Sequence, residues 1–94
     1  MRHVPRWEMP EISRFLGIVI RMYFFDHEPP HFHAAYSGMN AQIQIDPTTM
    51  LRGWLPQRVF ALVTEWARLH REELFLNWRR LHAGFPRIRI PPLE

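Results

Sequence analysis

Three histidines lie close together at His27, His31 and His33, and two prolines stand between the first and the second. Imidazole changes its charge near neutral pH, which suits general acid–base chemistry, and it is a common metal ligand. Proline fixes φ and reduces the conformational freedom of the unfolded chain. A stiffened loop that carries three imidazoles therefore indicates a functional site.

Metal binding is one chemistry that this spacing allows. His31 and His33 point to the same side if a strand has already begun, because side chains alternate along a strand. Together with His27 they form a set that suits a divalent metal such as zinc. Asp26 or Glu28 would then supply a further ligand, or His70 could reach the cluster from the helix.

A second chemistry needs no metal or other cofactor. Two imidazoles in opposite protonation states can act as general acid and general base on a phosphodiester, while a guanidinium steadies the phosphate. In this hypothesis, which makes the chain a ribonuclease, the catalytic residues are His27, His31, His33, His70 and Arg21. A purely structural role remains as the alternative, with the histidines hydrogen-bonded to the turn and to a buried carbonyl.

The first element that must position these groups is a strand predicted over residues 15–25, which is rich in β-branched and aromatic residues. Both of its faces are largely apolar, which predicts cover on both sides. We assign one face to the core, beginning with Leu16, Ile18 and Ile20. We assign the other face to a partner protein or a second copy of the chain, and it includes Phe15, Val19 and Tyr23.

Further strands are predicted over residues 32–37 and 41–45, joined by a tight connection at Gly38. Residues 50–55 predict a short fourth strand. Trp54 lies at the end of that strand, where we expect it to be exposed and to belong to the partner-binding surface.

A long helix follows, because Pro56 is a favourable first residue and apolar residues then recur at helical spacing. As one rod over residues 57–83 it would be roughly 40 Å long, so it must project beyond the sheet or bend near Arg71. The predicted fold is α+β, with an antiparallel meander of three to four strands and a long C-terminal helix on one face. Ile43, Ile45, Val59, Val63 and Trp66 are predicted to join the core.

We expect a single domain over residues 9–84, a disordered extension over residues 1–8 and an edge strand in the tail, residues 85–94. The absence of cysteine excludes disulfides and cysteine-based zinc sites. No apolar run approaches the ~20 residues of a membrane span, and the N-terminus lacks the apolar segment of a signal peptide. We therefore expect a cytoplasmic protein without membrane contact.

All twelve basic residues are arginine, and the formal net charge is +3. A sequence pI near 10.6 passes the rough criterion for nucleic-acid binding, a pI above about 9. The basic residues are scattered along the chain, so RNA is one candidate partner among others.

Several stretches of the chain match a known family in order. They are residues 9–15 (MPEISRF), residues 17–24 (GIVIRMYF), the run from His27 to His33, and the helical segment with Glu65-Trp66, residues 69–74 and Asn77-Trp78. Over about residues 9–83 the chain resembles the small prokaryotic proteins of the domain-of-unknown-function 4160 family. The resemblance implies a compact bacterial protein and one half of a binary module of the toxin–antitoxin type, and it assigns no catalytic residues.

The resemblance and the apolar second face of the first strand favour the same primary hypothesis. We expect an interaction module that binds a second small protein or a copy of itself. A metal-independent ribonuclease and a histidine-based metal-binding protein are the alternatives.

Overall fold

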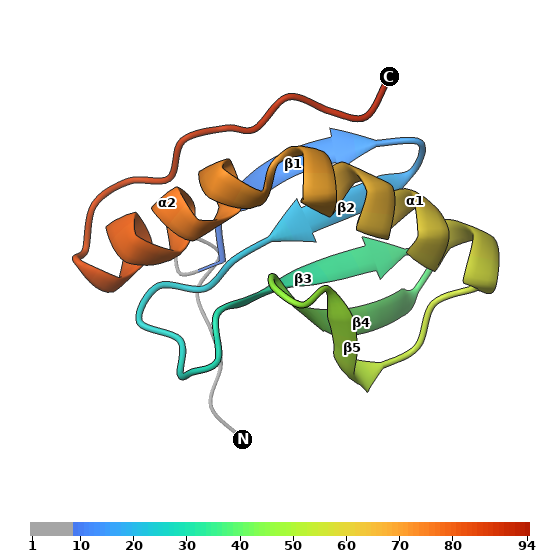
Figure 1. Ribbon diagram of the computed structural model, residues 1–94, viewed down its shortest axis with the longest axis horizontal. Coiled ribbons are helices and arrows are strands. Elements are labelled where there is room, and N and C mark those ends of the chain that lie inside the picture. The colour runs from blue at the N-terminus through green and yellow to red at the C-terminus, as the bar shows by residue number, and fades with distance from the viewer. Residues whose placement is uncertain (1–8) are drawn as a thin grey trace.

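The computed structural model describes residues 9–94, which form a five-stranded antiparallel sheet and two helices (Figure 1). The strands follow one another across the sheet in chain order, so the sheet is a simple meander. The predicted disorder of residues 1–8 lies outside the described residues. The strands are β1 (Glu11–Phe15), β2 (Ile18–Arg21), β3 (His31–Tyr36), β4 (Met39–Gln44) and β5 (Thr49–Gly53).

The long first strand predicted over residues 15–25 is wrong, because the chain reverses within it. β1 ends at Phe15, and Leu16 and Gly17 form a two-residue turn before β2 begins at Ile18. Both turn residues have positive φ, 51° and 79°, as in the hairpin turns that match the twist of a sheet. The reversal puts Leu16 at the hairpin tip, where its side chain is 64% exposed.

Phe15 takes the opposite role to the one predicted for it. Its side chain is 5% exposed, and its ring centroid lies 5.3 Å from that of Trp66 in the helical layer. The assignment of Phe15 to a partner-binding face, and of Leu16 to the core, was therefore wrong. An apolar run with a single glycine does not reveal a turn by its periodicity alone.

The strands predicted over residues 32–37, 41–45 and 50–55 are confirmed as β3, β4 and β5, with each end within two residues of the prediction. The meander thus has five strands instead of the predicted three or four, because the first predicted segment contains a turn and β1 begins four residues before it.

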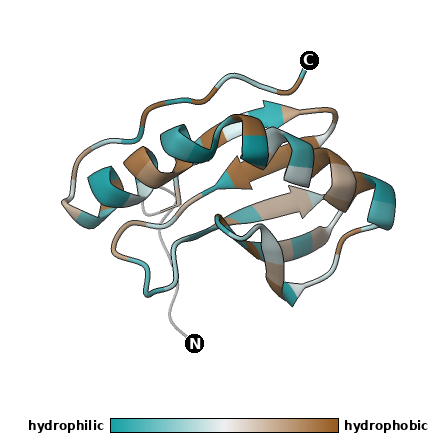
Figure 2. Cartoon of the chain, viewed as in Figure 1, coloured by the Kyte–Doolittle hydropathy of each residue, from teal (hydrophilic) through white to brown (hydrophobic). Residues whose placement is uncertain are grey.

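The predicted long helix is two helices, α1 (Gln57–Leu69) and α2 (Arg71–His82), and both lie over one face of the sheet (Figure 1). The chain breaks at His70, with φ −116° and ψ 28°, so the predicted bend near Arg71 is confirmed. In Figure 2 the sheet is most hydrophobic along β2, and hydrophilic and hydrophobic residues alternate along the helices. The sheet and the helices bury Ile18, Ile20, Ile43, Ile45, Val59, Val63 and Trp66, as predicted.

The C-terminal tail is an extended segment without strand structure, so the predicted edge strand over residues 85–94 was wrong. One ladder-like hydrogen bond exists, from the Ile90 N–H to the Ile12 carbonyl at 2.8 Å. Two residues earlier in the tail, the side chain of Asn77 donates to the carbonyl of Ile88 and accepts from its N–H, both at 2.8 Å. The backbone of Ile88 is therefore hydrogen-bonded to a side chain of α2 and not to a neighbouring strand.

Within the described residues, neither helix combines the length and the apolar character that crossing a membrane would require.

Candidate functional site

The face of the sheet that the helices leave open carries a row of polar side chains. Arg21 of β2 pairs with His33 of β3, His33 pairs with Gln42 of β4, and Gln42 pairs with Arg52 of β5. Directly opposite residues of antiparallel strands place their side chains on the same face. These four residues, the polar row, therefore cross the sheet side by side.

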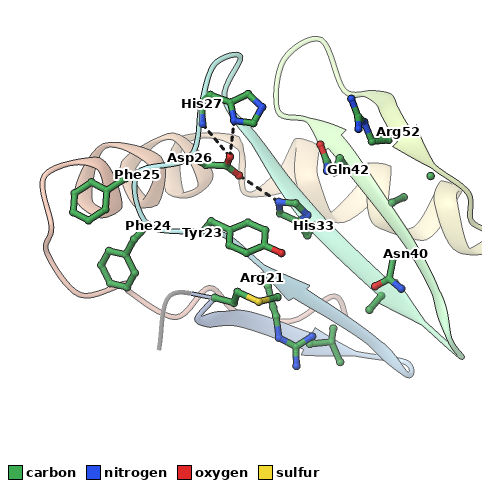
Figure 3. Close-up of a pocket in the computed structure, with 15 residues that line it drawn as sticks. Arg21, Tyr23, Phe24, Phe25, Asp26, His27, His33, Asn40, Gln42 and Arg52 are labelled. Carbon is green, nitrogen blue, oxygen red and sulfur yellow. Dashed lines mark hydrogen bonds and ion pairs between the residues drawn. The ribbon is translucent and has the colours of Figure 1, made fainter. Parts of the chain in front are cut away.

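A hollow of about 610 Å³ lies over the polar row (Figure 3), within the usual size range of small-ligand sites. We call it the open-face hollow. Its lining combines apolar and polar groups, and outside the polar row it includes Val19, Tyr23, Phe24, Asp26, His27, Ala35 and Asn40.

Both arginines of the polar row lack a bonded partner. Within residues 9–94, neither Arg21 nor Arg52 has an ion pair or a side-chain hydrogen bond. Glu11 is the cross-strand neighbour of Arg21, but its carboxylate is bound by Arg14 at 2.7 Å and by Arg89 at 3.0 Å. Two guanidinium groups are therefore free to bind an anion on this face.

A cluster of imidazoles surrounds the carboxylate of Asp26 beside the hollow. The Oδ2 atom lies 2.9 Å from His31 Nε2 and 3.4 Å from His33 Nε2. His27 interacts with the other oxygen, because both its backbone N–H, at 2.9 Å, and its Nδ1, at 3.2 Å, are directed to Oδ1. The His31 side chain is 3% exposed and that of His27 is 91% exposed, so the two imidazoles occupy very different environments.

The second helix holds this cluster in place from below. Trp78 packs on His31 with ring centroids 5.3 Å apart, and on His82 at 4.4 Å. His82 Nε2 contacts the backbone carbonyl of Asp26, which ties the loop after β2 to the end of α2. His31 donates from Nδ1 to the Pro29 carbonyl at 2.7 Å, so its ring is fixed within the loop as well.

The environment of His33 shifts its protonation. Burial is the main cause that lowers the pKa of His33, the charge of His31 lowers it further, and the hydrogen bond with Asp26 opposes both. The ring of Tyr23 packs edge-on against His33, with centroids 4.5 Å apart. A lowered pKa keeps the imidazole neutral near pH 7, the form that acts as a base or a metal ligand.

The structure brings together most, but not all, of the residues predicted to be catalytic. His27, His31 and His33 meet around Asp26, and Arg21 lies opposite His33 on the next strand.

His70 lies apart from them, at the break between the helices. Its Nδ1 is 2.5 Å from Glu73 Oε1 and its ring packs on Trp66 at 5.7 Å. No hydrogen bond, ion pair or ring contact joins His70 to the histidine loop in the described chain.

The predicted partner-binding residues are divided between the core and the open face. Phe15 is buried, whereas Val19 and Tyr23 line the open-face hollow. Trp54 is 62% exposed and follows Gly53, which is also part of the hollow.

Sequence reasoning missed Gln42, Arg52 and His82. The first two belong to the polar row through strand register, which no local pattern predicts. His82 was detectable in part, since it lies four residues after Trp78 and so on the same side of the helix.

Taken together, fold and site define a small α+β protein whose sheet has one face covered by helices and one open face that is crossed by a row of polar side chains. The chain belongs to the family described as Domain of unknown function (DUF4160), whose model matches residues 17–79, more than half of the chain. The matched segment includes Asp26, the three histidines around its carboxylate and the whole polar row. No curated protein and no solved structure matches the chain.

Proposed function

We propose that this protein binds single-stranded RNA across the open face of its sheet. The observation that carries the proposal is a pair of arginines at the two ends of the polar row, Arg21 and Arg52, neither of which has an ion-pair or hydrogen-bond partner for its side chain within residues 9–94. The planar guanidinium group donates hydrogen bonds in a geometry that matches phosphate.

The spacing of the two arginines favours a polyanion over a single phosphate. Arg21 and Arg52 are three strand spacings apart, about 14 Å between their backbones at about 4.8 Å per spacing. A chain of phosphates can lie along such a row and reach both groups.

The groups around the arginines suit unpaired bases. Gln42 and Asn40 offer amide donors and acceptors, and Tyr23 offers an aromatic ring. Trp54 is an exposed aromatic residue that directly follows Gly53 of the hollow. Bases stack on such rings, each contributing about 1–3 kcal/mol, and open sheet faces are a common platform for single-stranded RNA. We propose that this protein meets its RNA in the cytoplasm, a compartment with which the absence of cysteine is compatible.

The structure supports the primary sequence-based hypothesis, a protein-binding module, less well. That hypothesis rests on the family resemblance and on the second apolar face of the first predicted strand. Phe15 of that face is packed inside the chain's own core, whereas Val19 and Tyr23 line the open-face hollow. A toxin–antitoxin component that acts on RNA would satisfy both the family resemblance and the polar face.

Fluorescence anisotropy with a labelled single-stranded RNA tests the proposal. We expect Arg21→Ala and Arg52→Ala each to weaken binding and to reduce the slope of log K against log salt by about 0.7, the contribution of one phosphate contact. Arg68→Ala is the matched control, because Arg68 is exposed on α1 in the helical layer.

Two outcomes would contradict the proposal. One is an absence of RNA binding at low salt, and the other is an equal loss of affinity in all three variants. If RNA does not bind and an acidic protein segment binds in a manner that depends on Arg21 and Arg52, the partner hypothesis replaces it.

Cleavage of the bound RNA is a second candidate function, favoured by one contact. His33 Nε2 lies 3.4 Å from Asp26 Oδ2, and Arg21 is the cross-strand neighbour of His33. An imidazole oriented by a carboxylate beside a phosphate-binding guanidinium is a reasonable general base. In the presence of a chelator, His33→Ala should abolish cleavage and His70→Ala should not, and cleavage that survives in His33→Ala excludes this role.

A further inference from the structure

Asp26 Oδ2 faces Nε2 of both His31 and His33, and this arrangement also suits the binding of a metal ion. Asp26, His31 and His33, here called the Asp26 cluster, each offer a ligand atom, and these atoms all lie within 4.8 Å of one another. Ligands bound tetrahedrally at about 2.1 Å from a metal lie about 3.4 Å apart. The separation of 3.4 Å between Asp26 Oδ2 and His33 Nε2 equals that value, and the separation of 2.9 Å between Asp26 Oδ2 and His31 Nε2 is somewhat shorter.

The hydrogen bond of His31 indicates which of its ring nitrogens is free. Nδ1 lies 2.7 Å from the Pro29 carbonyl, which can only accept, so Nδ1 carries a proton. In a neutral ring Nε2 then presents a lone pair, and it faces the carboxylate oxygen of Asp26 at 2.9 Å. Two acceptors at that distance, around a side chain that is 3% exposed, require either a shared proton or a metal ion between them.

The surroundings of the cluster resemble the outer shell of a metal site. A metal-binding histidine commonly donates its other N–H to a backbone carbonyl, as His31 does to Pro29. The Asp26 carboxylate is oriented in turn by the backbone N–H of His27, which occupies Oδ1 and leaves Oδ2 to the cluster. The contact of His82 with the Asp26 carbonyl fixes the backbone at the same place.

These observations also change the ligand set expected from the sequence. His27 is 91% exposed and is directed to Oδ1, so Asp26 takes its place as the third ligand. His33 and Asp26 also line the open-face hollow, so an ion held by the cluster would have an open position on that side.

We propose that Asp26, His31 and His33 bind one divalent transition-metal ion of the Zn²⁺, Co²⁺ or Ni²⁺ class. Two imidazoles and one carboxylate match the ligand preference of these ions, whereas Ca²⁺ and Mg²⁺ prefer sites made of oxygen ligands. The inference stands on the Asp26 cluster alone and does not depend on RNA binding.

Metal titration of the full-length, tag-free protein, first stripped with EDTA, tests the proposal. We expect Co²⁺ to produce visible d–d absorption, Zn²⁺ to displace it at one equivalent, and Mg²⁺ to have no effect. Asp26→Asn keeps the shape of the side chain and removes its charge, and His33→Ala removes a ligand at a half-buried position. Each should weaken Zn²⁺ binding by more than about tenfold.

Two control variants distinguish metal binding at the Asp26 cluster from metal binding by exposed histidines and from RNA binding. His27→Ala removes the exposed neighbour of the cluster and should leave Zn²⁺ affinity unchanged. Arg21→Ala should also leave it unchanged while it weakens RNA binding, so that either proposal can fail without the other. Far-UV circular dichroism of every variant checks that the fold is intact.

Three results would overturn the metal proposal. The first is a wild-type protein that binds no Co²⁺ or Zn²⁺ at neutral pH, which would leave a proton as the cation between His31 and Asp26. The second is a Zn²⁺ affinity that is lost in His27→Ala and retained in His33→Ala, which would mean that exposed histidines bind the metal and the Asp26 cluster does not. The third is unchanged affinity in Asp26→Asn.

Discussion

Truncation of two adjacent apolar residues, Phe15 and Leu16, tests the hairpin on which the whole sheet depends. Phe15 is 5% exposed and packs on Trp66, which is fully buried. Removing such a ring leaves a cavity, so Phe15→Ala should cost about 3–5 kcal/mol of unfolding free energy. Leu16 is 64% exposed at the hairpin tip, and Leu16→Ala should change stability by less than about 0.5 kcal/mol.

Urea unfolding followed by circular dichroism measures both effects. With an m-value of about 1.5 kcal/mol/M, Phe15→Ala should lower the midpoint by about 2–3 M, whereas Leu16→Ala should leave it nearly unchanged. Phe15→Leu retains most of the apolar volume and should cost less than about 1.5 kcal/mol, which separates lost packing from a general intolerance of substitution. A continuous first strand predicts the reverse order, so a Leu16→Ala variant less stable than Phe15→Ala would refute the hairpin.

Two further predictions concern the same edge of the sheet. Leu16→Asn should raise stability by about 0.5 kcal/mol in the same unfolding assay, because Leu16 has a φ of 51° and asparagine tolerates that region far better; a loss of stability would contradict the turn geometry. The hydrogen bond from Arg14, with a weaker one from Arg89, lowers the pKa of Glu11 to about 2 from 4.5. The ionised carboxylate therefore stabilises the fold above about pH 4.5, and this is lost as the pH falls towards about 2. Because these side chains are partly exposed, we expect the carboxylate to contribute about 1 kcal/mol to the free energy of unfolding. In Glu11→Gln this free energy should therefore fall less steeply as the pH is lowered from about 4.5 to about 2, and an unchanged pH dependence would refute the prediction.

Local patterns predicted the elements that are periodic over several residues. The apolar residues after Pro56 repeat at helical spacing, and the alternation of residues 41–45 is that of a strand with one buried face. Both patterns involve only residues that are close in the chain, so they can be recognised without knowledge of the fold. The turn at Leu16-Gly17 left no such signal, because apolar residues flank it on both sides.

The candidate site was predicted in its chemistry and only partly in its membership. The concentration of imidazoles from His27 to His33 is visible in the sequence, and the structure shows them around one carboxylate. The prediction for His70 rested on helical periodicity, which gives the side of a helix but not the element opposite it. The structure instead pairs His70 with Glu73.

The sequence by itself determined that this chain forms a small α+β domain with a stiffened histidine loop, because composition, proline positions and periodicity act locally. Only the tertiary structure decided which groups share a face. Strand register aligned Arg21, His33, Gln42 and Arg52. The packing of α2 against the loop after β2 placed His82 against Asp26, which lies 56 positions earlier in the chain. Register follows from the packing of all strands and helices together, so no single segment encodes it.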